Sequence, residues 1–286
     1  MTAFSAVADV RERLAVTGYL ADESIATTAF LADRLGKPLL VEGPAGVGKT
    51  ELAKAVATAT GADLVRLQCY EGLDEARALY EWNYKKQLLR IQASRDGSAW
   101  EQVHDDVFGE EFLLDRPLLA AIRRSQPTVL LIDEVDKADV EMEGLLLEVL
   151  SDFQVTIPEL GTIAAVRRPF VVLTSNASRE LSEALKRRCL YLHMDYPAPQ
   201  REREIVLARV PEAAERLVDQ VVRTVAALRG LDLRKAPSIA ETIDWARALV
   251  ALGRDELDGG TARGTLGVVL KHAADQERAA GALSLG

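Results

Sequence analysis

Cysteine and histidine are scarce in this chain. Only Cys69 and Cys189 occur among its 286 residues, they form no CxxC pair, and the three histidines stand far apart at positions 104, 193 and 272. A disulfide framework or a zinc site needs such residues in clusters, so the sequence predicts neither. We interpret both cysteines as small core residues.

Long apolar runs are missing as well. The longest, such as residues 128–132, are far shorter than the roughly 20 residues that a membrane-spanning helix needs. The first ten residues include Asp9 and have neither a basic start nor a long apolar stretch, which is not typical of a signal peptide. We therefore expect a cytoplasmic protein without a membrane span.

Positive charge is also in deficit. Lys and Arg number 35 against 44 Asp and Glu, which gives a net charge of −9. Proteins that coat nucleic acid rely on a dense positive face. The negative net charge argues against a nucleic-acid partner, although a chain with this net charge can still carry a local basic patch.

The chain does contain alternating strand and helix patterns. Helical patterns over 22–35 and 51–59 flank a short apolar strand at 38–41, and Gly36 and Gly61 follow as stops. Further strands are predicted at 64–67, in "PTVLLIDE" and in "FVVLTSN", with a helix near 142–150 and a hairpin in "FQVTIPELGTIAAV". This order predicts an α/β fold with a doubly wound parallel sheet.

After Pro199 no further strand is predicted. Apolar positions recur with helical spacing over 205–210, 217–228, 239–252 and 266–280, which indicates a small bundle. We therefore divide the chain into an αβα domain at 1–198 and a helical domain at 199–286.

Residues 68–116 are a candidate insertion. They are polar and irregular, with a predicted loop at "SRDGS", and they concentrate Tyr70, Tyr80, Trp82 and Tyr84 in a chain with only 5% aromatic residues. These rings either pack the insertion onto the core or grip a client protein.

The stretch "GPAGVGKT", Gly43 to Thr50, matches the pattern GxxxxGK[ST]. It lies between a predicted strand and a predicted helix, where backbone N–H groups and the helix N-terminus can bind phosphate. The alternative is a glycine-rich turn that merely joins the strand to the helix, and this context argues against it. Lys49 would reach the β and γ phosphates, and the Thr50 hydroxyl would bind Mg²⁺. The predicted ATP-binding residues are Gly43, Pro44, Ala45, Gly46, Val47, Gly48, Lys49, Thr50 and Glu51.

Two acids follow the strand in "LLIDEVDKAD". Asp133 would hold Mg²⁺ through water and Glu134 would polarise the attacking water, which implies hydrolysis of ATP to ADP and phosphate. The alternative is a pair of solvated carboxylates at a strand end. Asn176, after the next buried strand, would orient the water or touch the γ phosphate, or else it is a turn residue.

The segment "LKRRC" supplies Arg187 and Arg188. A guanidinium at the γ phosphate accelerates hydrolysis, and residues this late in the core are expected at a subunit edge, so the active site would be shared. The alternative is a solvated basic surface.

Together "GPAGVGKT", "LLIDEVDKAD", "VVLTSN" and "LKRRC" resemble the AAA+ ATPases, and the hairpin before "VVLTSN" resembles their MoxR branch. "RLQCYEGLDEARALYEWNY" and "LGVVLKHAADQERAA" are similar to the ATPases encoded beside carbon monoxide dehydrogenase and related molybdenum hydroxylases. The resemblance implies a homo-oligomeric, hexameric ring with a P-loop core, a C-terminal lid, and Arg188 as a finger in trans. It also implies a partner with a von Willebrand factor A domain and a chaperone-like role in maturing a client metalloenzyme.

The chain departs from this family in one place. MoxR-type proteins usually carry a sensor arginine shortly after a proline in the lid, whereas "RKAPSIAETIDW" has Ser238 there. Ser238 and Glu241 form a predicted capping box, and Arg234 or Lys235 could serve instead.

Three other functions stay open at this point. ATP could merely assemble a ring that docks partners, the same phosphate chemistry could drive a nucleic-acid motor, or the chain could be a metal chelatase subunit.

Overall fold

The computed structural model describes residues 3–93 and 107–282. These described residues form two compact units, the first from residues 3–17, 21–42, 52–93 and 107–192, and the second from residues 18–20, 43–51 and 193–282.

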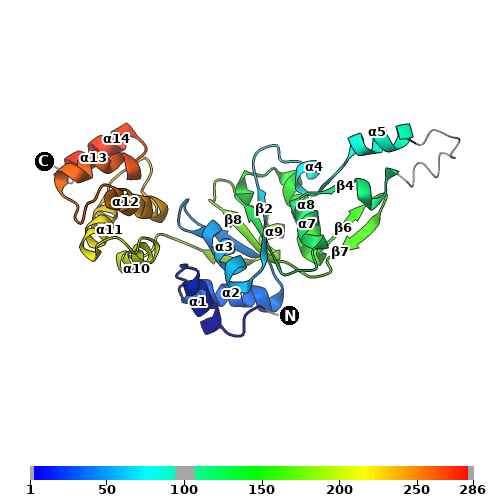
Figure 1. Ribbon diagram of the computed structural model, residues 1–286, viewed down its shortest axis with the longest axis horizontal. Helices are drawn as coiled ribbons and strands as arrows, with labels where there is room; N and C mark the ends of the chain where they lie inside the picture. The colour runs from blue at the N-terminus through cyan, green and yellow to red at the C-terminus, as the bar shows by residue number, and fades with distance from the viewer. Residues whose placement is uncertain (1–2, 94–106, 283–286) are drawn as a thin grey trace. The chain divides into compact units, whose positions relative to one another are not determined.

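A five-stranded sheet is the centre of the first unit (Figure 1). Its strand order is β2-β5-β8-β1-β9, and β2 with β5, β5 with β8 and β8 with β1 pair in parallel. Parallel neighbours need crossover connections, which confirms the predicted doubly wound α/β fold. The strands are β1 (Leu39–Glu42), β2 (Asp63–Gln68), β5 (Thr128–Asp133), β8 (Phe170–Ser175) and β9 (Leu190–His193).

The helices of the first unit supply the apolar surface that the sheet needs. All six residues of β5 are buried, as its continuous apolar sequence predicts, and Leu130 and Ile132 share a core with Leu118 and Leu146. Cys69 and Cys189 are both buried, and burial is the main cause that raises the pKa of each thiol to about 12. The helices are α1 (Val7–Val16), α2 (Glu23–Leu35), α3 (Lys49–Thr60), α7 (Pro117–Arg123), α8 (Val140–Asp152) and α9 (Glu183–Arg188), with the 3-10 turn η2 (Val135–Lys137).

Local signals explain where α2 begins and ends. The Asp22 carboxylate accepts a hydrogen bond from the Ile25 N–H at 2.8 Å, which caps the first turn. Gly36 follows the last turn in the left-handed region at φ 60°, a conformation that favours glycine. Both agree with the expected helix.

The insertion is more regular than its sequence predicts. It contains α4 (Glu75–Ala78), β3 (Tyr80–Trp82), α5 (Tyr84–Ala93), the 3-10 turn η1 (Glu110–Phe112) and β4 (Leu113–Asp115), and β3 pairs antiparallel with β4. Trp82 is buried and meets Tyr80 and Phe108 edge to face, so it packs the insertion, whereas Tyr70 and Tyr84 are exposed. The expected "SRDGS" loop lies outside the described residues.

The hairpin expected before the last core strand is present. Strands β6 (Gln154–Ile157) and β7 (Gly161–Ala164) pair antiparallel, with Ile157 opposite Gly161. Gly161 has φ 76°, which suits the glycine at this end of the turn.

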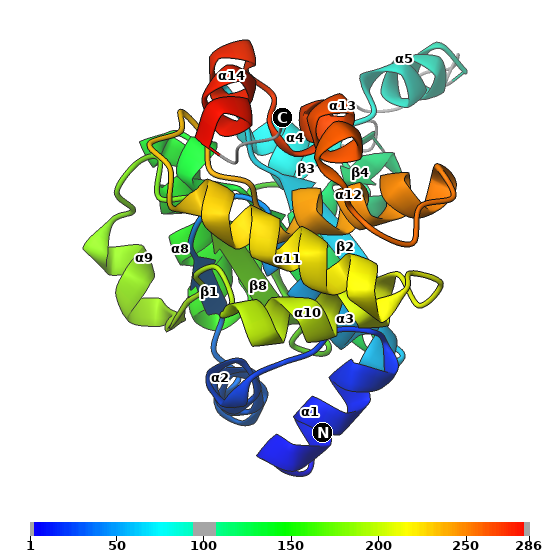
Figure 2. The same ribbon diagram turned by 90° about the vertical axis from the view of Figure 1, so that its left-hand side faces the viewer.

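Most of the second unit is a helical bundle formed by the residues after β9 (Figure 2), and residues 18–20 and 43–51 belong to the same unit. Its core includes Leu217, Val221, Trp245, Leu249 and Leu266. The single helix expected over 266–280 is wrong, because one helix ends at Val269 and the next begins at Ala273. The helices are α10 (Pro199–Arg209), α11 (Glu215–Arg229), α12 (Ile239–Ala251), α13 (Gly259–Val269) and α14 (Ala273–Ala282).

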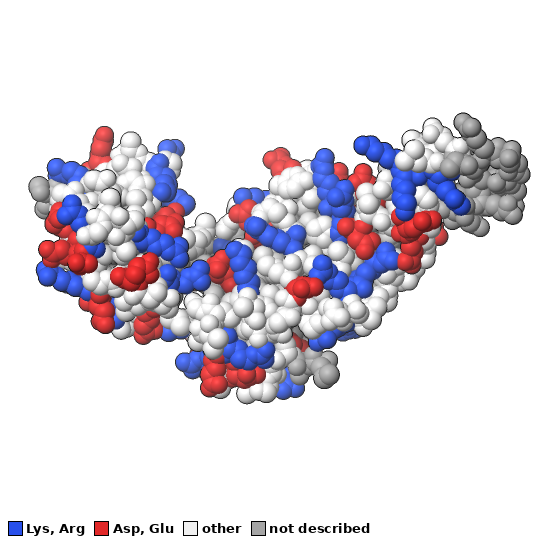
Figure 3. All heavy atoms as spheres, viewed as in Figure 1, with Lys and Arg blue, Asp and Glu red and all other residues white. Residues whose placement is uncertain are grey.

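Within the described residues, no helix is both long and apolar enough to cross a membrane. Basic and acidic side chains are interspersed on the face drawn in Figure 3. That face therefore offers no continuous positive stripe of the kind that nucleic-acid binding uses.

The first prediction concerns the sheet core. Leu130→Ala should lower the free energy of unfolding by about 2–5 kcal/mol, because it leaves a cavity at a buried position of β5. Leu88→Ala on exposed α5 is the matched control and should have little effect. Urea unfolding followed by circular dichroism measures both, and equal losses would contradict the core assignment.

Candidate functional site

The parallel register brings the ends of several strands to one edge of the sheet. Gln68 at the end of β2 is opposite Asp133 at the end of β5, and Glu42 at the end of β1 is opposite Ser175 of β8. We call this the carboxyl edge. Ligands of open α/β sheets bind at such an edge, and the predicted phosphate loop leaves β1 there, directly after Glu42.

Asp133 is fixed at the carboxyl edge by two donors. Its side chain is only 3% exposed. The Thr174 hydroxyl donates to Oδ1 at 2.6 Å, and Arg66 Nη2 donates to Oδ2 at 2.5 Å. The carboxylate is therefore fixed in position, and carboxylate oxygens are among the ligands that Mg²⁺ accepts.

Glu134 lies beside it in a strained backbone conformation. Its φ of 57° and ψ of 49° are left-handed, which is uncommon for a residue with a long side chain. The Glu134 N–H donates to the Thr174 hydroxyl at 2.9 Å, so one threonine fixes both acids. Strain at such a position is typical of functional sites.

Three donors hold the Glu134 carboxylate. Gln68 Nε2 and Lys137 Nζ donate to Oε2 at 2.9 and 2.8 Å, and Asn176 Nδ2 donates to Oε1 at 3.3 Å. The structure thus brings together three predicted residues, Asp133, Glu134 and Asn176. Both oxygens of Glu134 accept hydrogen bonds, which orients the carboxylate, and Oε1 keeps a lone pair that can accept from water.

Asp136 positions the turn that carries Asn176. It accepts hydrogen bonds from the Asn176 N–H at 3.2 Å, the Ser178 N–H at 3.0 Å and the Ser178 hydroxyl at 2.6 Å. Burial alone would raise the pKa of Asp136, but these hydrogen bonds outweigh burial and hold that pKa below its usual value.

The phosphate loop has the backbone that its glycines predict. Gly43 has φ 155° and Gly46 φ 77°, and a Cβ there would lie 1.8 Å from the Met194 carbonyl oxygen or 2.2 Å from the Ser238 hydroxyl, respectively. Only glycine fits such approaches. Lys49 is 6% exposed, and its ammonium donates to the Gly43 and Pro44 carbonyls at 2.7 Å each.

The rest of the loop lies as expected from its sequence. Val47 is buried, Thr50 is the second residue of α3, and Glu51 forms an ion pair with Arg209 at 3.6 Å. The N-terminus of α3, next to the glycines, provides the partial positive charge that attracts phosphate. Backbone N–H groups, a lysine ammonium and a helix N-terminus are the kinds of donor that bind a triphosphate, and a threonine hydroxyl such as that of Thr50 is an oxygen ligand of the type that Mg²⁺ accepts.

Arg188 is placed away from the acids of its own chain. It is exposed at the end of α9, where its Nε donates to the Ser151 hydroxyl at 2.5 Å and Nη1 to the Ala184 carbonyl at 3.2 Å. The strand that follows begins beside the start of β1, because the Leu190 N–H donates to the Pro38 carbonyl at 2.8 Å. Arg188 therefore lies near the edge of the sheet opposite Asp133 and Glu134.

The lid position without an arginine is a helix cap. Ser238 and Glu241 form the expected capping box at the start of α12. The Ala240 N–H donates to the Gly46 carbonyl at 3.3 Å, so this helix start contacts the phosphate loop. Lys235 pairs with Glu241 at 3.4 Å, and the Arg234 N–H donates to Asp275 at 3.0 Å.

Sequence reasoning missed the residues that hold the two acids. Gln68, Thr174, Lys137 and Arg66 all contact Asp133 or Glu134. Lys137 lies in "LLIDEVDKAD" and Thr174 in "VVLTSN", so their closeness in sequence to Glu134 and Asn176 could have identified them. Gln68 and Arg66 become neighbours only through the order of the strands.

Known proteins were compared with this chain. A family model described as AAA domain (dynein-related subfamily) matches residues 38–189. An uncharacterized protein of Staphylococcus haemolyticus (strain JCSC1435) is 25% identical over 238 residues, covering 81% of this chain and 82% of the relative. Chaperone protein ClpB 2 of Parasynechococcus marenigrum (strain WH8102) is 36% identical over 135 residues, but the match covers only 47% of this chain and 13% of that protein. A solved structure of a Thermotoga maritima RuvB mutant is similar to this chain with a TM-score of 0.49 and 16% sequence identity. The match covers 98% of this chain and 71% of the RuvB chain.

The second prediction tests the Asp136 network. The pKa of Asp136 is lower in the folded protein than its ordinary value of 3.8, so ionised Asp136 stabilises the fold at pH values above 3.8. This stabilisation is lost as the pH falls through the folded pKa. Ser178→Ala removes one donor, so it should cost about 1–3 kcal/mol near pH 7 and less as the pH drops below about 4.

Urea unfolding between about pH 3 and pH 7 measures this difference. Ser24→Ala, an exposed serine on α2, is the control and should show no such pH dependence. A Ser178→Ala deficit that stays constant down to about pH 3 would contradict the network.

Proposed function

This chain belongs to the dynein-related subfamily of the AAA domain family, and we propose that it is an ATPase that remodels a partner protein. The observation that carries the proposal is the arrangement of Asp133, Glu134 and Asn176 at the edge where the phosphate loop leaves β1. The AAA+ fold implies nucleotide binding, and the finer roles below are part of the proposal.

The nucleotide would be ATP with Mg²⁺. The backbone N–H groups of residues 43–48 and the start of α3 would bind its phosphates, while Lys49 would leave the Gly43 and Pro44 carbonyls for the β and γ phosphates. Thr50 would be a direct Mg²⁺ ligand and Asp133 a ligand through water. Among the described residues no group of three or more His, Cys, Asp or Glu side chains is arranged to hold a metal ion, and we propose that the phosphates complete the coordination.

Glu134 would polarise the attacking water. A general base must reach that water within a hydrogen-bond length, and the left-handed turn at Glu134 aims its carboxylate along the carboxyl edge toward Asn176. Asn176 would then orient the water once its amide releases Glu134. The two acids therefore have separate tasks, one at the metal and one at the water.

Arg188 would act on the nucleotide of a neighbouring protomer. AAA+ proteins are typically oligomeric, and an exposed guanidinium at the edge opposite the acids is suited to a contact in trans. We propose a hexameric ring in which each active site is completed by the next protomer.

The identity of the partner rests on the sequence resemblance. We propose a MoxR-type ATPase in the cytoplasm, with an αβα domain at 1–198 and a lid at 199–286. Its partners would be a protein with a von Willebrand factor A domain and a client metalloenzyme of the molybdenum hydroxylase type. The 36% identity to a chaperone over 135 residues supports a remodelling role.

One observation favours a second function, a switch in which ATP assembles a docking ring and hydrolysis only resets it. Three side-chain donors hold the Glu134 carboxylate, and moving any of them before catalysis would slow hydrolysis. Glu134→Gln separates the two functions. Loss of client maturation with the ring and docking intact supports remodelling by hydrolysis, and preserved maturation supports the switch.

The third prediction concerns the chemistry within one protomer. Glu134→Gln should bind ATP normally but hydrolyse it about 10²–10³-fold more slowly, because the amide cannot take a proton from water. Lys49→Ala should lose binding itself. Fluorescent-nucleotide titration and phosphate release measure the two effects, and wild-type turnover in Glu134→Gln would overturn the assignment.

The fourth prediction concerns the shared active site. Arg188→Ala should bind ATP but hydrolyse it at least about 10³-fold more slowly. Mixing it with Lys49→Ala, which still carries Arg188, should restore part of the activity. Arg187→Ala is the matched control for a neighbouring guanidinium. If the mixture is no more active than the sum of its parts, Arg188 does not act in trans.

A further inference from the structure

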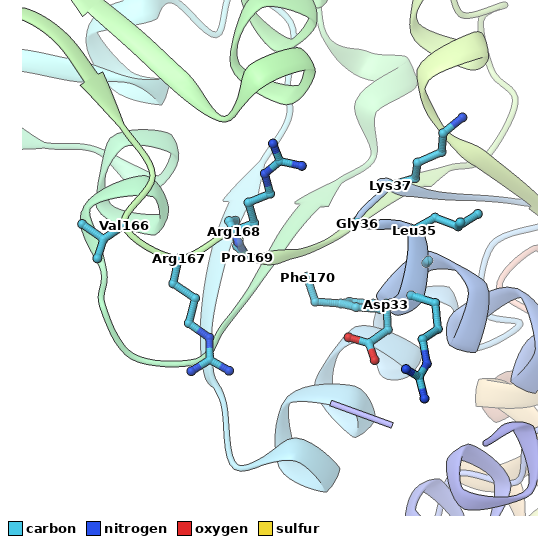
Figure 4. Close-up of a pocket in the computed structure, with 11 residues that line it drawn as sticks. Asp33, Leu35, Gly36, Lys37, Val166, Arg167, Arg168, Pro169 and Phe170 are labelled. Atoms are coloured by element: carbon cyan, nitrogen blue, oxygen red, sulfur yellow. The ribbon is translucent and has the colours of Figure 1, made fainter. Parts of the chain in front are cut away.

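A basic pocket opens at the amino edge of the sheet, opposite the carboxyl edge. It has a volume of about 490 Å³ and is lined by the end of α2 with residues 36–37 and by residues 166–170, which lead into β8. Figure 4 shows Arg167 and Arg168 leaving this second segment in opposite directions. Residues 36–38 precede β1, so the pocket lies where two parallel strands begin.

The pocket concentrates positive charge in an acidic protein. Arg34, Lys37, Arg167 and Arg168 line it, against a single acid, Asp33. Among residues 3–93 and 107–282, none of these four cations has a carboxylate within ion-pair distance. Arg34 and Arg168 lie over the rings of Phe30 and Phe153, and Arg34 Nη2 donates to the Ser5 carbonyl at 3.1 Å. These contacts are attractive but bring no carboxylate to the pocket.

Asp33 does not neutralise the pocket by a direct ion pair. Its carboxylate accepts a hydrogen bond from the Phe4 N–H at 3.0 Å, which ties it to the N-terminal segment. The pocket thus has three positive charges in excess, while the whole chain carries −9. Like charges held close together repel one another, and an anionic surface would relieve this repulsion.

The segment that carries Arg188 meets the chain directly after the pocket residue Lys37. The Leu190 N–H donates to the Pro38 carbonyl at 2.8 Å, and the charge of Lys37 acts on the Cys189 thiol, which directly follows Arg188. If Arg188 reaches the nucleotide of a neighbour, the amino edge of one protomer must face the carboxyl edge of the next. The pocket would then face that neighbour too.

The carboxyl edge has acids that match the pocket. Glu71 and Glu75 follow β2, and Glu141 lies in the first turn of α8, which follows β5. All three are exposed and without an ion pair within the described parts of the chain. The Gly72 N–H donates to Asp139 at 3.1 Å, so the two acidic segments are held together.

We propose that the basic pocket is a protomer contact and that a second copy of this chain fills it with the acidic segments of its carboxyl edge, Glu71, Glu75 and Glu141. The proposal rests on the proposed ring with Arg188 in trans. Such a contact is heterologous, since two different surfaces of one chain meet, and repeating it closes a ring. It also gives the assembly a direction, because like edges repel.

The test is assembly of the full chain with ATP and Mg²⁺, measured by sedimentation velocity at low and high salt. Lys37→Glu with Arg167→Glu should raise the protein concentration needed for half-assembly at least about 10-fold at low salt, and the difference should shrink at high salt. Arg254→Glu with Arg263→Glu changes the net charge equally on exposed positions of the second unit and is the control. Circular dichroism verifies that each variant is folded.

A mixing experiment identifies the occupant. Glu71→Lys with Glu141→Lys should also assemble poorly alone, but an equal mixture of the two reversed variants should assemble as wild type does, because each basic edge then meets an acidic one. A pocket variant that assembles like the control, or a mixture that shows no rescue, overturns the pocket contact and leaves the ATPase proposal intact. A wild-type chain that binds ATP yet never assembles overturns the ring and the pocket contact together.

Discussion

The hydrogen bonds of one threonine connect the fold to the candidate chemistry. Thr174 in β8 donates to the Asp133 carboxylate and accepts from the Glu134 N–H, so it joins two neighbouring strands at their carboxyl ends. This pairing depends on the parallel register, which places Ile132 opposite Leu173. A shift of one residue would turn the Thr174 side chain to the other face of the sheet and leave a buried carboxylate without its donor, which is costly. Burial of the strands therefore fixes where the two acids lie.

The two acids at this edge are held in different ways. Asp133 has a buried carboxylate, and the hydroxyl and the guanidinium that donate to it offset part of the cost of burying a charge. Glu134 instead combines a left-handed backbone with three side-chain donors, each of which is worth only a modest net free energy. Asp133 is therefore fixed within the sheet, whereas the Glu134 carboxylate depends on a strained backbone and on contacts with three other side chains.

Patterns along the chain predicted most of the fold, but contacts between distant segments could not be read from them. The apolar run of β5 and the caps of α2 are local signals, and both elements were predicted correctly. Asp133, Glu134 and Asn176 follow predicted strands, so their meeting was expected. Gln68 was not identified, since its contact with Glu134 needs the order β2-β5, which no local pattern specifies. The break between α13 and α14 was missed because apolar spacing continues across it.

The serine at the expected sensor position has a structural cause. Ser238 is 2% exposed, and its hydroxyl and N–H both contact the Glu241 carboxylate. Burial would raise the pKa of Glu241, yet these bonds and Lys235 outweigh it and lower that pKa. The Ser238 hydroxyl also lies close to where a Cβ on Gly46 would be. A longer side chain at position 238 would therefore not fit beside Gly46 without loss of the capping box. The lid helix therefore meets the phosphate loop through a hydroxyl and a backbone N–H, and an arginine at this position would have to break the cap that begins the helix.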